Sequence, residues 1–336
     1  MLTIKNRVLG CAVGIHVGDS LGGPYETWGP AEIAADLAKR GGLTFFDYPN
    51  TRPDDTGLAV LPAGMPTDDT DQTACLAKSL IVCDGLDTSD LYARLRENVV
   101  DQKSLLWSGP SIGAGKTTRN ALSGDPDLVA TARSNPVGSN GALMRTAPLA
   151  IWYGRELMQV DDEKRKQAAV VAKRDTYLMA DTTHAHMHAQ DATWLYVMIL
   201  ASLLAGNQPR DAIGDIEWID PDSLNRELTI RVLSQLRDGA LVPQDPGGSP
   251  MRSAAEFSLY AALYCLIHTK SFAEGIEMAI RIGGDTDTYA AIAGGLLGAY
   301  YGYEAIPDAW RRGILGHDVM VDLGTSLYQH SFGTTE

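Results

Sequence analysis

Helical periodicity is the feature of this 336-residue sequence that most constrains its fold. Apolar residues recur at helical spacing through most of the chain, and alternating strand patterns are nearly absent. Helices are predicted over residues 4–21, 70–83, 88–104, 142–153, 163–180, 186–205, 224–238, 252–268, 271–282 and 286–301. The apolar runs 58–61 and 129–132 are too short to support a sheet, and the Pro/Gly-rich breaks look like loops. The pattern therefore predicts an all-α fold in a single domain over residues 1–336.

Two glycine series recur at every fourth residue. They are Gly10, Gly14, Gly18 and Gly22 near the start of the chain, and Gly294, Gly298 and Gly302 near its end. Glycines at this spacing form one stripe along a helix, although each costs up to ~1 kcal/mol relative to alanine. Close approach of another backbone usually offsets such a cost. We therefore predict that the first and last parts of the chain pack tightly together or against neighbouring elements; flexible helix ends are the alternative.

The composition limits which partners the protein can bind and indicates its cellular compartment. A formal net charge of −14 argues against a nucleic-acid backbone as a partner, because phosphate binding needs a basic surface. It fits divalent-cation binding or a soluble surface. The cysteines form no C-x-x-C pair and lie in or beside apolar runs, as expected for reduced thiols. Without a secretory pattern or an apolar run of membrane-spanning length, the prediction is a cytoplasmic protein with no membrane partner.

Two short acidic clusters stand where a loop enters a predicted helix. They read Thr67-Asp68-Asp69-Thr70 and Asp285-Thr286-Asp287-Thr288. Helix N-capping explains one such residue at each place, but not several carboxylates and hydroxyls within four positions. Their mutual repulsion needs a cation, and hard oxygen ligands suit Mg²⁺ or Mn²⁺, with Ca²⁺ possible. We therefore predict that the two clusters face each other across a two-metal centre that serves hydrolysis, with capping as the alternative.

At these motifs the chain resembles the ADP-ribosylglycohydrolase family, of the dinitrogenase-reductase-activating type. The resemblance runs nearly end to end through GIHVGDSLGGPYE (14–26), TDDTDQT (67–73), GAGKTTRNAL (113–122), SNGALMRTAP (139–148), THAH (183–186) and GGDTDTYAAIAGGLLGAYYG (283–302). TDDT and GGDTDT in this order are specific together, whereas either alone is weak. The resemblance implies an orthogonal all-α helical bundle and cleavage of the glycosidic bond at C1″ of ADP-ribose.

The resemblance also implies a set of metal ligands and a catalytic carboxylate. By position, two Mg²⁺ ions (Mn²⁺ possible) are held by Thr67, Asp68, Asp69, Asp285, Asp287 and Thr288. Glu26 falls where some members have a glutamate beside the metals, although it could also be a surface or capping acid. Bond cleavage develops oxocarbenium-like charge, and a carboxylate commonly assists the attacking water. Asp68, Asp69 and Glu26 all stay open as the base.

A third group of residues is implied to bind ADP-ribose: Gly113, Ala114, Gly115, Ser139, Asn140, Gly141, Met144 and His184. The glycine loop 111–119 is not a Walker P-loop, because Pro110 replaces the required glycine. Ser111 stands where a common family version has an aspartate, so an acid that orients the substrate or acts in catalysis in some members is missing here. The alternatives are a helix start at 138–140, an ordinary core role for Met144, and polar residues opening a helix around His184.

A histidine-rich stretch and Tyr289 each allow two interpretations. A zinc site on His184, His186 and His188 is not expected, since only 184 and 188 would share a helical face. Tyr289 is bulky where an aliphatic residue is usual, so it either contacts substrate or packs.

Together these features predict a metal-dependent hydrolase that releases ADP-ribose from a mono-ADP-ribosylated protein or small acceptor, with an arginine-type linkage favoured. A hydrolase of another ADP-ribose derivative, an O-acetyl or phosphate ester, is one alternative. A catalytically silent ADP-ribose-binding relative is the other, and the complete acidic clusters weigh against it.

Overall fold

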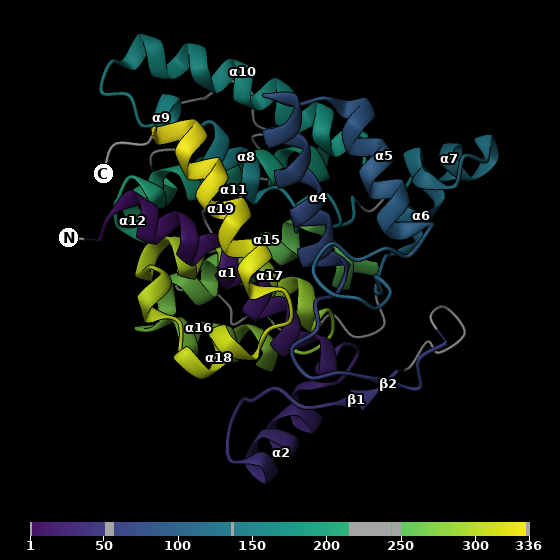
Figure 1. The fold of residues 1–336 in the computed structure, drawn as a ribbon. Helices are drawn as coiled ribbons and strands as arrows, with labels where there is room; N and C mark the ends of the chain where they lie inside the picture. Colours follow the sequence, from purple (N-terminus) through teal and green to yellow (C-terminus); the bar gives the residue numbers. More distant parts are fainter. Residues whose placement is uncertain (1, 51–56, 136–137, 215–242, 244–249, 334–336) are drawn as a thin grey trace.

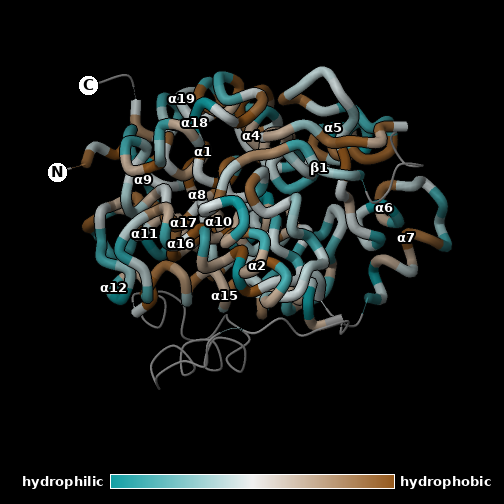
Figure 2. Tube along the Cα trace, turned by 90° about the horizontal axis from the view of Figure 1, so that it is seen from below, coloured by the Kyte–Doolittle hydropathy of each residue, from teal (hydrophilic) through white to brown (hydrophobic). Residues whose placement is uncertain are grey.

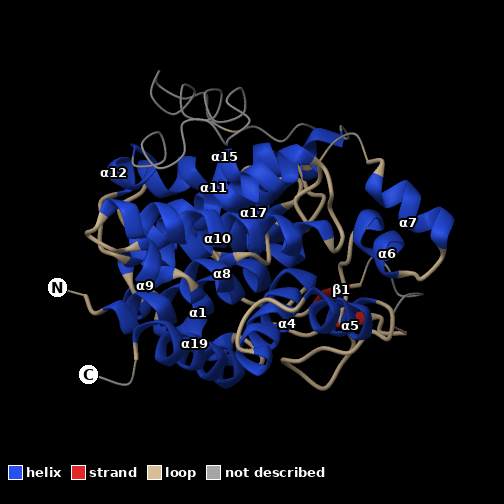
Figure 3. Ribbon diagram, turned by 90° about the horizontal axis from the view of Figure 1, so that it is seen from above, coloured by secondary structure: helices blue, strands red, loops and turns tan. Residues whose placement is uncertain are grey.

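The computed structural model describes residues 2–50, 57–135, 138–214, 243 and 250–333 (Figure 1). Its helices are α1 (Ile4–Gly22), α2 (Pro30–Arg40), α4 (Asp68–Cys83), α5 (Thr88–Val99), α6 (Lys116–Leu122), α7 (Pro126–Arg133), α8 (Ala147–Trp152), α9 (Gly154–Leu157), α10 (Asp162–Asp181), α11 (Met187–Leu204), α12 (Pro209–Gly214), α15 (Ala255–His268), α16 (Phe272–Arg281), α17 (Thr286–Tyr301), α18 (Asp308–Gly313) and α19 (His317–Phe332). Short 3₁₀ turns cover Gly23–Tyr25, Pro250–Ser253 and Tyr303–Ala305. The all-α prediction is confirmed (Figure 3).

The strand content of the described part is one small antiparallel pair. Strands β1 (Tyr48–Pro49) and β2 (Val60–Leu61) place Tyr48 opposite Leu61 and Pro49 opposite Val60. With α2, this pair projects from one end of the bundle (Figure 1). The projection matters for function, because it brings residues 46–50 beside the site described below.

Helices α1 and α17 form the centre of the bundle, and α4, α11, α15, α16 and α19 pack around them. A Cβ on Gly14 would overlap the carbonyl oxygen of Gly294, and one on Gly10 would overlap that of Gly298. The prediction that the first and last glycine series pack tightly together is therefore confirmed. Both helices are buried on nearly all sides, whereas most outer helices alternate between hydrophobic and hydrophilic residues (Figure 2).

Several predicted helix boundaries are wrong. The segment predicted as helical over 142–153 starts as a series of turns, and α8 begins only at Ala147, where Pro148 in the first turn favours a helix start. The helix predicted to reach 104 ends at Val99, and Gln102 beyond it has a positive φ of 53°. The predicted helix 224–238 lies outside the described residues.

Several helices were not predicted from the sequence, namely α2, α6, α7, α9, α12, α18 and α19. Most are short or rich in polar residues, so their apolar face is only a few residues long. The apolar run 129–132 lies inside one of them, α7, rather than in a strand.

Candidate functional site

The two acidic clusters meet at the N-terminal ends of α4 and α17. Thr67 is the N-cap of α4, and its hydroxyl accepts a hydrogen bond from the Asp69 amide at 3.4 Å. The Asp69 Oδ2 atom accepts hydrogen bonds from the hydroxyls of Thr67 and Thr288, both at 3.3 Å. Asp285 occupies the N-cap position of α17 but makes no side-chain capping bond; its Oδ2 accepts instead from Asn140 Nδ2 at 2.8 Å. Helix capping therefore explains Thr67, but it does not explain the acidic residues of the two clusters.

The carboxylates of the clusters lie in an environment that disfavours their charges. Asp68, Asp69 and Asp287 are buried, and their pKa values are raised well above the usual range. Burial is the largest cause, and repulsion from neighbouring carboxylates adds to it: Asp19 acts on Asp68 and Asp69, and Glu26 on Asp287. The pKa of Asp285 is also raised by burial, partly opposed by its hydrogen bond from Asn140.

The oxygen atoms of the two clusters are suitable ligands for a divalent cation, although they are not arranged around a single point. Among the residues that the structure describes, no three His, Cys, Asp or Glu side chains are arranged to hold a metal ion. The buried Asp69 Oδ1 atom nevertheless has no hydrogen-bond partner within the described ranges, and the surrounding groups are hard oxygens with excess negative charge. A cation would relieve that repulsion and would replace the weak hydrogen bonds of Thr67 and Thr288 to Asp69.

Asp19, on α1, holds the first cluster in place, and sequence reasoning missed it. Its carboxylate accepts from the Thr67 amide at 3.0 Å, the Thr67 hydroxyl at 2.7 Å and the Thr70 amide at 3.1 Å, and also from the Thr70 hydroxyl. Burial raises the pKa of Asp19 to about 6, opposed by these hydrogen bonds. An acid within an otherwise apolar, glycine-rich helix was the available signal.

Arg145 supplies a buried positive charge beside the cluster, and it too was missed. The guanidinium is fully buried and donates to Gln72 Oε1 at 2.8 Å, to the Gly141 carbonyl at 2.9 Å and to Thr183 Oγ1 at 2.6 Å. Gln72 Nε2 in turn donates to Asp68 Oδ2 at 2.6 Å. Burial lowers the pKa of Arg145 to about 10, partly opposed by Asp68.

A cavity of about 470 Å³ opens over the clusters. Most of the predicted site residues line it, namely Glu26, Asp68, Asp69, Gly113, Gly115, Ser139, Asn140, Gly141, Met144, His184, Asp285, Asp287 and Thr288. Thr67 and Ala114 do not; they line the neighbouring cavity. Basic side chains that were not predicted, Lys116, Arg119 and Arg252, also line the first cavity.

Close contacts fix the residues of this cavity. A Cβ on Gly113, whose φ is +101°, would lie 2.5 Å from Asp68 Oδ1. A Cβ on Gly141 would lie 2.7 Å from His184 Cε1. Burial, and then the charge of Arg145, lower the pKa of His184 to about 3, so its ring is neutral.

The remaining motifs have structural roles. The Nδ1 atom of His186 accepts a hydrogen bond from the His188 amide at 3.2 Å, and His186 is the N-cap of α11. Tyr289 is buried, and its hydroxyl donates to the Arg252 carbonyl, so it packs. Ser111 is buried and lines the second cavity.

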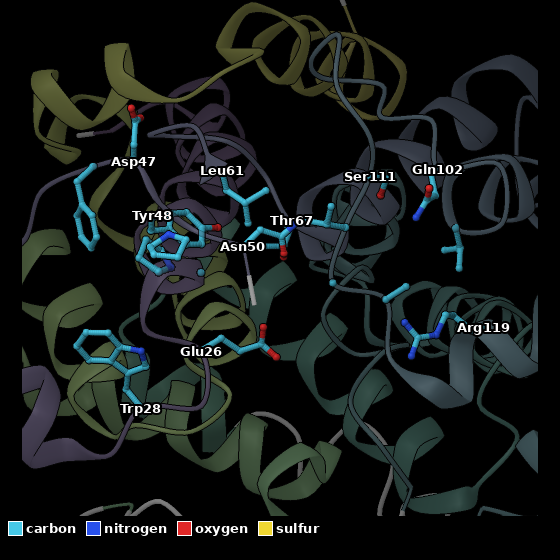
Figure 4. A pocket seen from close by; sticks show the side chains of 18 of the residues that line it. Glu26, Trp28, Asp47, Tyr48, Asn50, Leu61, Thr67, Gln102, Ser111 and Arg119 are labelled. Atoms are coloured by element: carbon cyan, nitrogen blue, oxygen red, sulfur yellow. The ribbon is translucent and has the colours of Figure 1, made fainter. Parts of the chain in front are cut away.

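The second cavity, of about 550 Å³, was not predicted. Trp28 and Tyr48 stand on one side of it, and Gln102 and Arg119 on the other (Figure 4). The Glu26 carboxylate points into the space between these sides (Figure 4). Glu26, Gly113 and Arg119 line both cavities, so the two are neighbours.

The described helices form a bundle with a buried cluster of carboxylates and hydroxyls beneath a polar cavity. A family model for ADP-ribosylglycohydrolase matches residues 1–335, and the chain belongs to that family. It is therefore an enzyme of the class that hydrolyses ADP-ribose linkages, as the resemblance predicted.

Named relatives are similar over nearly the whole chain. "ADP-ribosylhydrolase ARH3" of Mus musculus is 25% identical, over 96% of this chain and 91% of the relative. "ADP-ribosyl-[dinitrogen reductase] glycohydrolase" of Rhodospirillum rubrum is 24% identical, over 92% and 90%. "ADP-ribosylarginine hydrolase Tri1" of Serratia proteamaculans (strain 568) is 25% identical, over 96% and 79%. A solved structure titled "ADP-ribosylglycohydrolase-related protein complex" superposes with a TM-score of 0.71 at 29% identity, covering 99% of this chain and 100% of that one.

The described part of the chain has no helix with the length and apolar character needed to cross a bilayer.

Proposed function

We propose that this enzyme releases ADP-ribose by metal-dependent hydrolysis of the C1″ glycosidic bond, with an arginine-type linkage as the favoured substrate. One observation carries the proposal: the Asp69 carboxylate receives hydrogen bonds from both Thr67 and Thr288. Two acidic clusters from opposite ends of the chain thus meet at one buried point below a polar cavity. Several buried carboxylates at one point favour the binding of a cation there, because buried charges are normally paired or coordinate metals.

Two Mg²⁺ ions, or Mn²⁺, are the proposed cofactors. The proposed ligands are Thr67, Asp68, Asp69, Asp285, Asp287 and Thr288. When bound, such ions polarise substrate oxygens and activate water. The unpartnered Asp69 Oδ1 and the raised pKa values of the cluster acids support this assignment, because both describe negative charge that a cation would stabilise.

Glu26 is the proposed general base. Its carboxylate points into the second cavity and it also lines the first, so it stands at their boundary (Figure 4). Asp68 and Asp69, whose carboxylates accept hydrogen bonds from Gln72 Nε2 and from two threonine hydroxyls, are proposed as metal ligands instead. Glu26 would accept a proton from the water that attacks C1″ as oxocarbenium-like charge develops in the sugar.

The first cavity is the proposed ADP-ribose site. Lys116, Arg119 and Arg252 place positive charge on its wall, where the pyrophosphate needs it. The loop Gly113, Ala114 and Gly115 would add backbone amides. Ser139, Asn140, Gly141, Met144 and His184 complete the proposed contacts with the nucleotide and ribose.

The acceptor that carries the ADP-ribose, the cellular compartment and the partners are proposed from the relatives, the cysteines and the net charge. An arginine-type linkage on a protein or small molecule is favoured because one relative bears the name ADP-ribosylarginine hydrolase. The four cysteines are all free thiols, which supports a reducing cytoplasm. The net charge of −14 supports the absence of a nucleic-acid backbone or an anionic membrane surface among the partners. We further propose that residues 1–336 act as one domain.

The test compares release of ADP-ribose from arginine-linked and serine-linked substrates, with Mg²⁺ or Mn²⁺ and with a chelator. Asp68→Ala should abolish release, while the matched surface variant Asp101→Ala should keep it, because Asp101 is exposed and outside both cavities. Release that survives both chelator and Asp68→Ala would refute the metal mechanism. If ADP-ribose is released only from its O-acetyl or phosphate esters, the enzyme cleaves an ester bond rather than the proposed glycosidic bond. If ADP-ribose binds and no substrate is cleaved, the protein is a catalytically silent relative.

A further inference from the structure

The second cavity adjoins the reaction centre on the side away from the proposed nucleotide site. Thr67 lines it, whereas Asp68 and Asp69 line the first cavity, and Glu26 and Gly113 line both. Because Glu26 is the proposed base for the water that attacks C1″, an ADP-ribose in the first cavity would place C1″ beside the Glu26 part of this shared wall. The group bonded to C1″ would then extend into the second cavity. This step rests on the proposed function.

Aromatic rings form one wall of the second cavity, and a buried tyrosine holds them. Tyr25 packs edge-on against Trp28, with ring centroids 5.6 Å apart, and against Phe46, with centroids 5.8 Å apart. Phe46 contacts Tyr48 in the same manner at 6.3 Å. Tyr25 is fully buried, and its hydroxyl donates to Asp36 at 3.0 Å. The wall is thus a rigid set of ring faces rather than a group of loose side chains.

Backbone contacts tie this wall to the acidic clusters. The Gly284 amide donates to the Trp28 carbonyl at 2.9 Å, and the Thr27 amide donates to the Gly284 carbonyl at 2.7 Å. Gly284 directly precedes Asp285. Near the other cluster, a Cβ on Gly23 would lie 3.0 Å from the Tyr48 hydroxyl oxygen and 3.3 Å from Thr67 Cγ2. The positions of Trp28 and Tyr48 relative to the two acidic clusters are therefore fixed by these contacts.

The wall already carries one guanidinium. Arg40 Cζ lies 3.4 Å from the centre of the Phe46 ring, and its charge is paired with Asp36 through an Nε–Oδ2 contact of 2.6 Å. Among the described residues, the acids that line the cavity are Glu26 and Asp47. A second planar cation could therefore stack on Trp28 or Tyr48 while the Glu26 carboxylate faces it (Figure 4).

We propose that the second cavity is the acceptor site and that Trp28 and Tyr48 select a planar guanidinium by stacking. A serine-linked acceptor has no planar group and gains nothing from the rings. The guanidinium could belong to an arginine side chain of a protein or to a free small guanidine. The same rings would stack on either, so both sources are tested below.

The first experiment measures KM and kcat for ADP-ribosylated arginine peptide, ADP-ribosylated agmatine and serine-linked ADP-ribosyl peptide. Trp28→Ala should raise KM for both guanidine substrates about tenfold, with kcat and the serine substrate changed less than about twofold. Trp28→Phe should restore most of the loss. The side chain of Trp28 is 36% exposed, so its truncation opens no core cavity. Tyr300→Ala, a partly buried ring outside both cavities, is the matched control.

Equal effects of Trp28→Ala on guanidine and serine substrates, or no effect on either, would overturn the acceptor assignment. A tenfold effect on the peptide alone would overturn recognition of free guanidines. If the wild-type protein releases no ADP-ribose, the proposed function fails, but the inference keeps its own readout. Calorimetry of agmatine binding in the presence of ADP-ribose should then show a Kd about tenfold weaker in Trp28→Ala, and equal binding would overturn the stacking role.

Discussion

Replacing Asp19 with asparagine should separate the stability of the fold from the affinity of the site for metal. The carboxylate of Asp19 accepts hydrogen bonds from two backbone amides and two hydroxyls, all belonging to Thr67 and Thr70. Asparagine has the same size but only one acceptor oxygen, and its amide group would face donors. Thr67, a proposed ligand, would lose its anchor.

The expected change in stability is small because two effects oppose each other. Loss of about two hydrogen bonds to a charged acceptor costs about 3–6 kcal/mol. Burial raises the pKa of Asp19 from 3.8 to about 6 even with these hydrogen bonds in place, so the burial penalty on the charged carboxylate is at least about 3 kcal/mol, and asparagine removes it. The free energy of unfolding should therefore fall by no more than about 3 kcal/mol at pH 7. Metal affinity should fall by about 10- to 100-fold, the usual effect of losing a partner that orients a ligand.

The assay is titration calorimetry with Mn²⁺, alongside urea unfolding. Thr70→Val keeps the charge of Asp19 and removes one of its hydrogen bonds, so it should also weaken Mn²⁺ binding, by several-fold. Asp175→Asn is the matched control: it removes a buried carboxylate on α10 that binds the Tyr153 hydroxyl, away from both cavities. The reasoning is refuted if Asp19→Asn binds Mn²⁺ as tightly as the wild-type protein. It is equally refuted if Asp175→Asn loses as much affinity, and unaltered binding in Thr70→Val would leave only the charge of Asp19 as the cause.

Three further predictions concern the core, the pH dependence and the glycine loop. Gly14→Ala should lower the free energy of unfolding by about 3 kcal/mol in urea, because its Cβ would overlap the Gly294 carbonyl; an unchanged midpoint would contradict the tight helix pair. His16 is buried, with neither ring nitrogen bonded among the described residues, and burial lowers its pKa from 6.5 to about 3. The unfolded chain binds this proton first as the pH falls, so stability should drop by up to ~1.4 kcal/mol per pH unit below 6.5, and His16→Leu should flatten that slope in urea titrations at pH 7, 6 and 5. Gly113→Ala should weaken Mn²⁺ binding at least about tenfold while the unfolding midpoint moves little, since its Cβ would press on Asp68; wild-type binding would show that the loop can shift freely.

Local patterns in the sequence were enough to predict the central helices and to locate the two acidic clusters at helix starts. The four-residue glycine spacing has one physical use in a buried helix, which is close backbone approach, and α1 meets α17 in that manner. Each acidic cluster lies within a single turn at a helix start, so its residues are near one another whatever the rest of the chain does. That local concentration of acid was already unusual before any fold was known.

Boundaries and short helices were less predictable, because they depend on what the rest of the chain covers. The turns before α8 are held by the Arg145 side chain, which donates back to the Gly141 carbonyl and across to Gln72 and Thr183. None of those partners is visible from the local apolar pattern. Competing long-range hydrogen bonds decided the backbone there.

The two acidic clusters were determined by the sequence itself, as an excess of oxygen ligands at two helix starts. Only the tertiary structure decided that Asp69 meets Thr288, that Asp19 and Arg145 support the cluster from within the bundle, and that an aromatic wall stands beyond Glu26. The physical reason is range. Helix propensity, capping and charge repulsion act over a few neighbouring residues, whereas a cavity and its partners arise where segments far apart in the chain exclude water together.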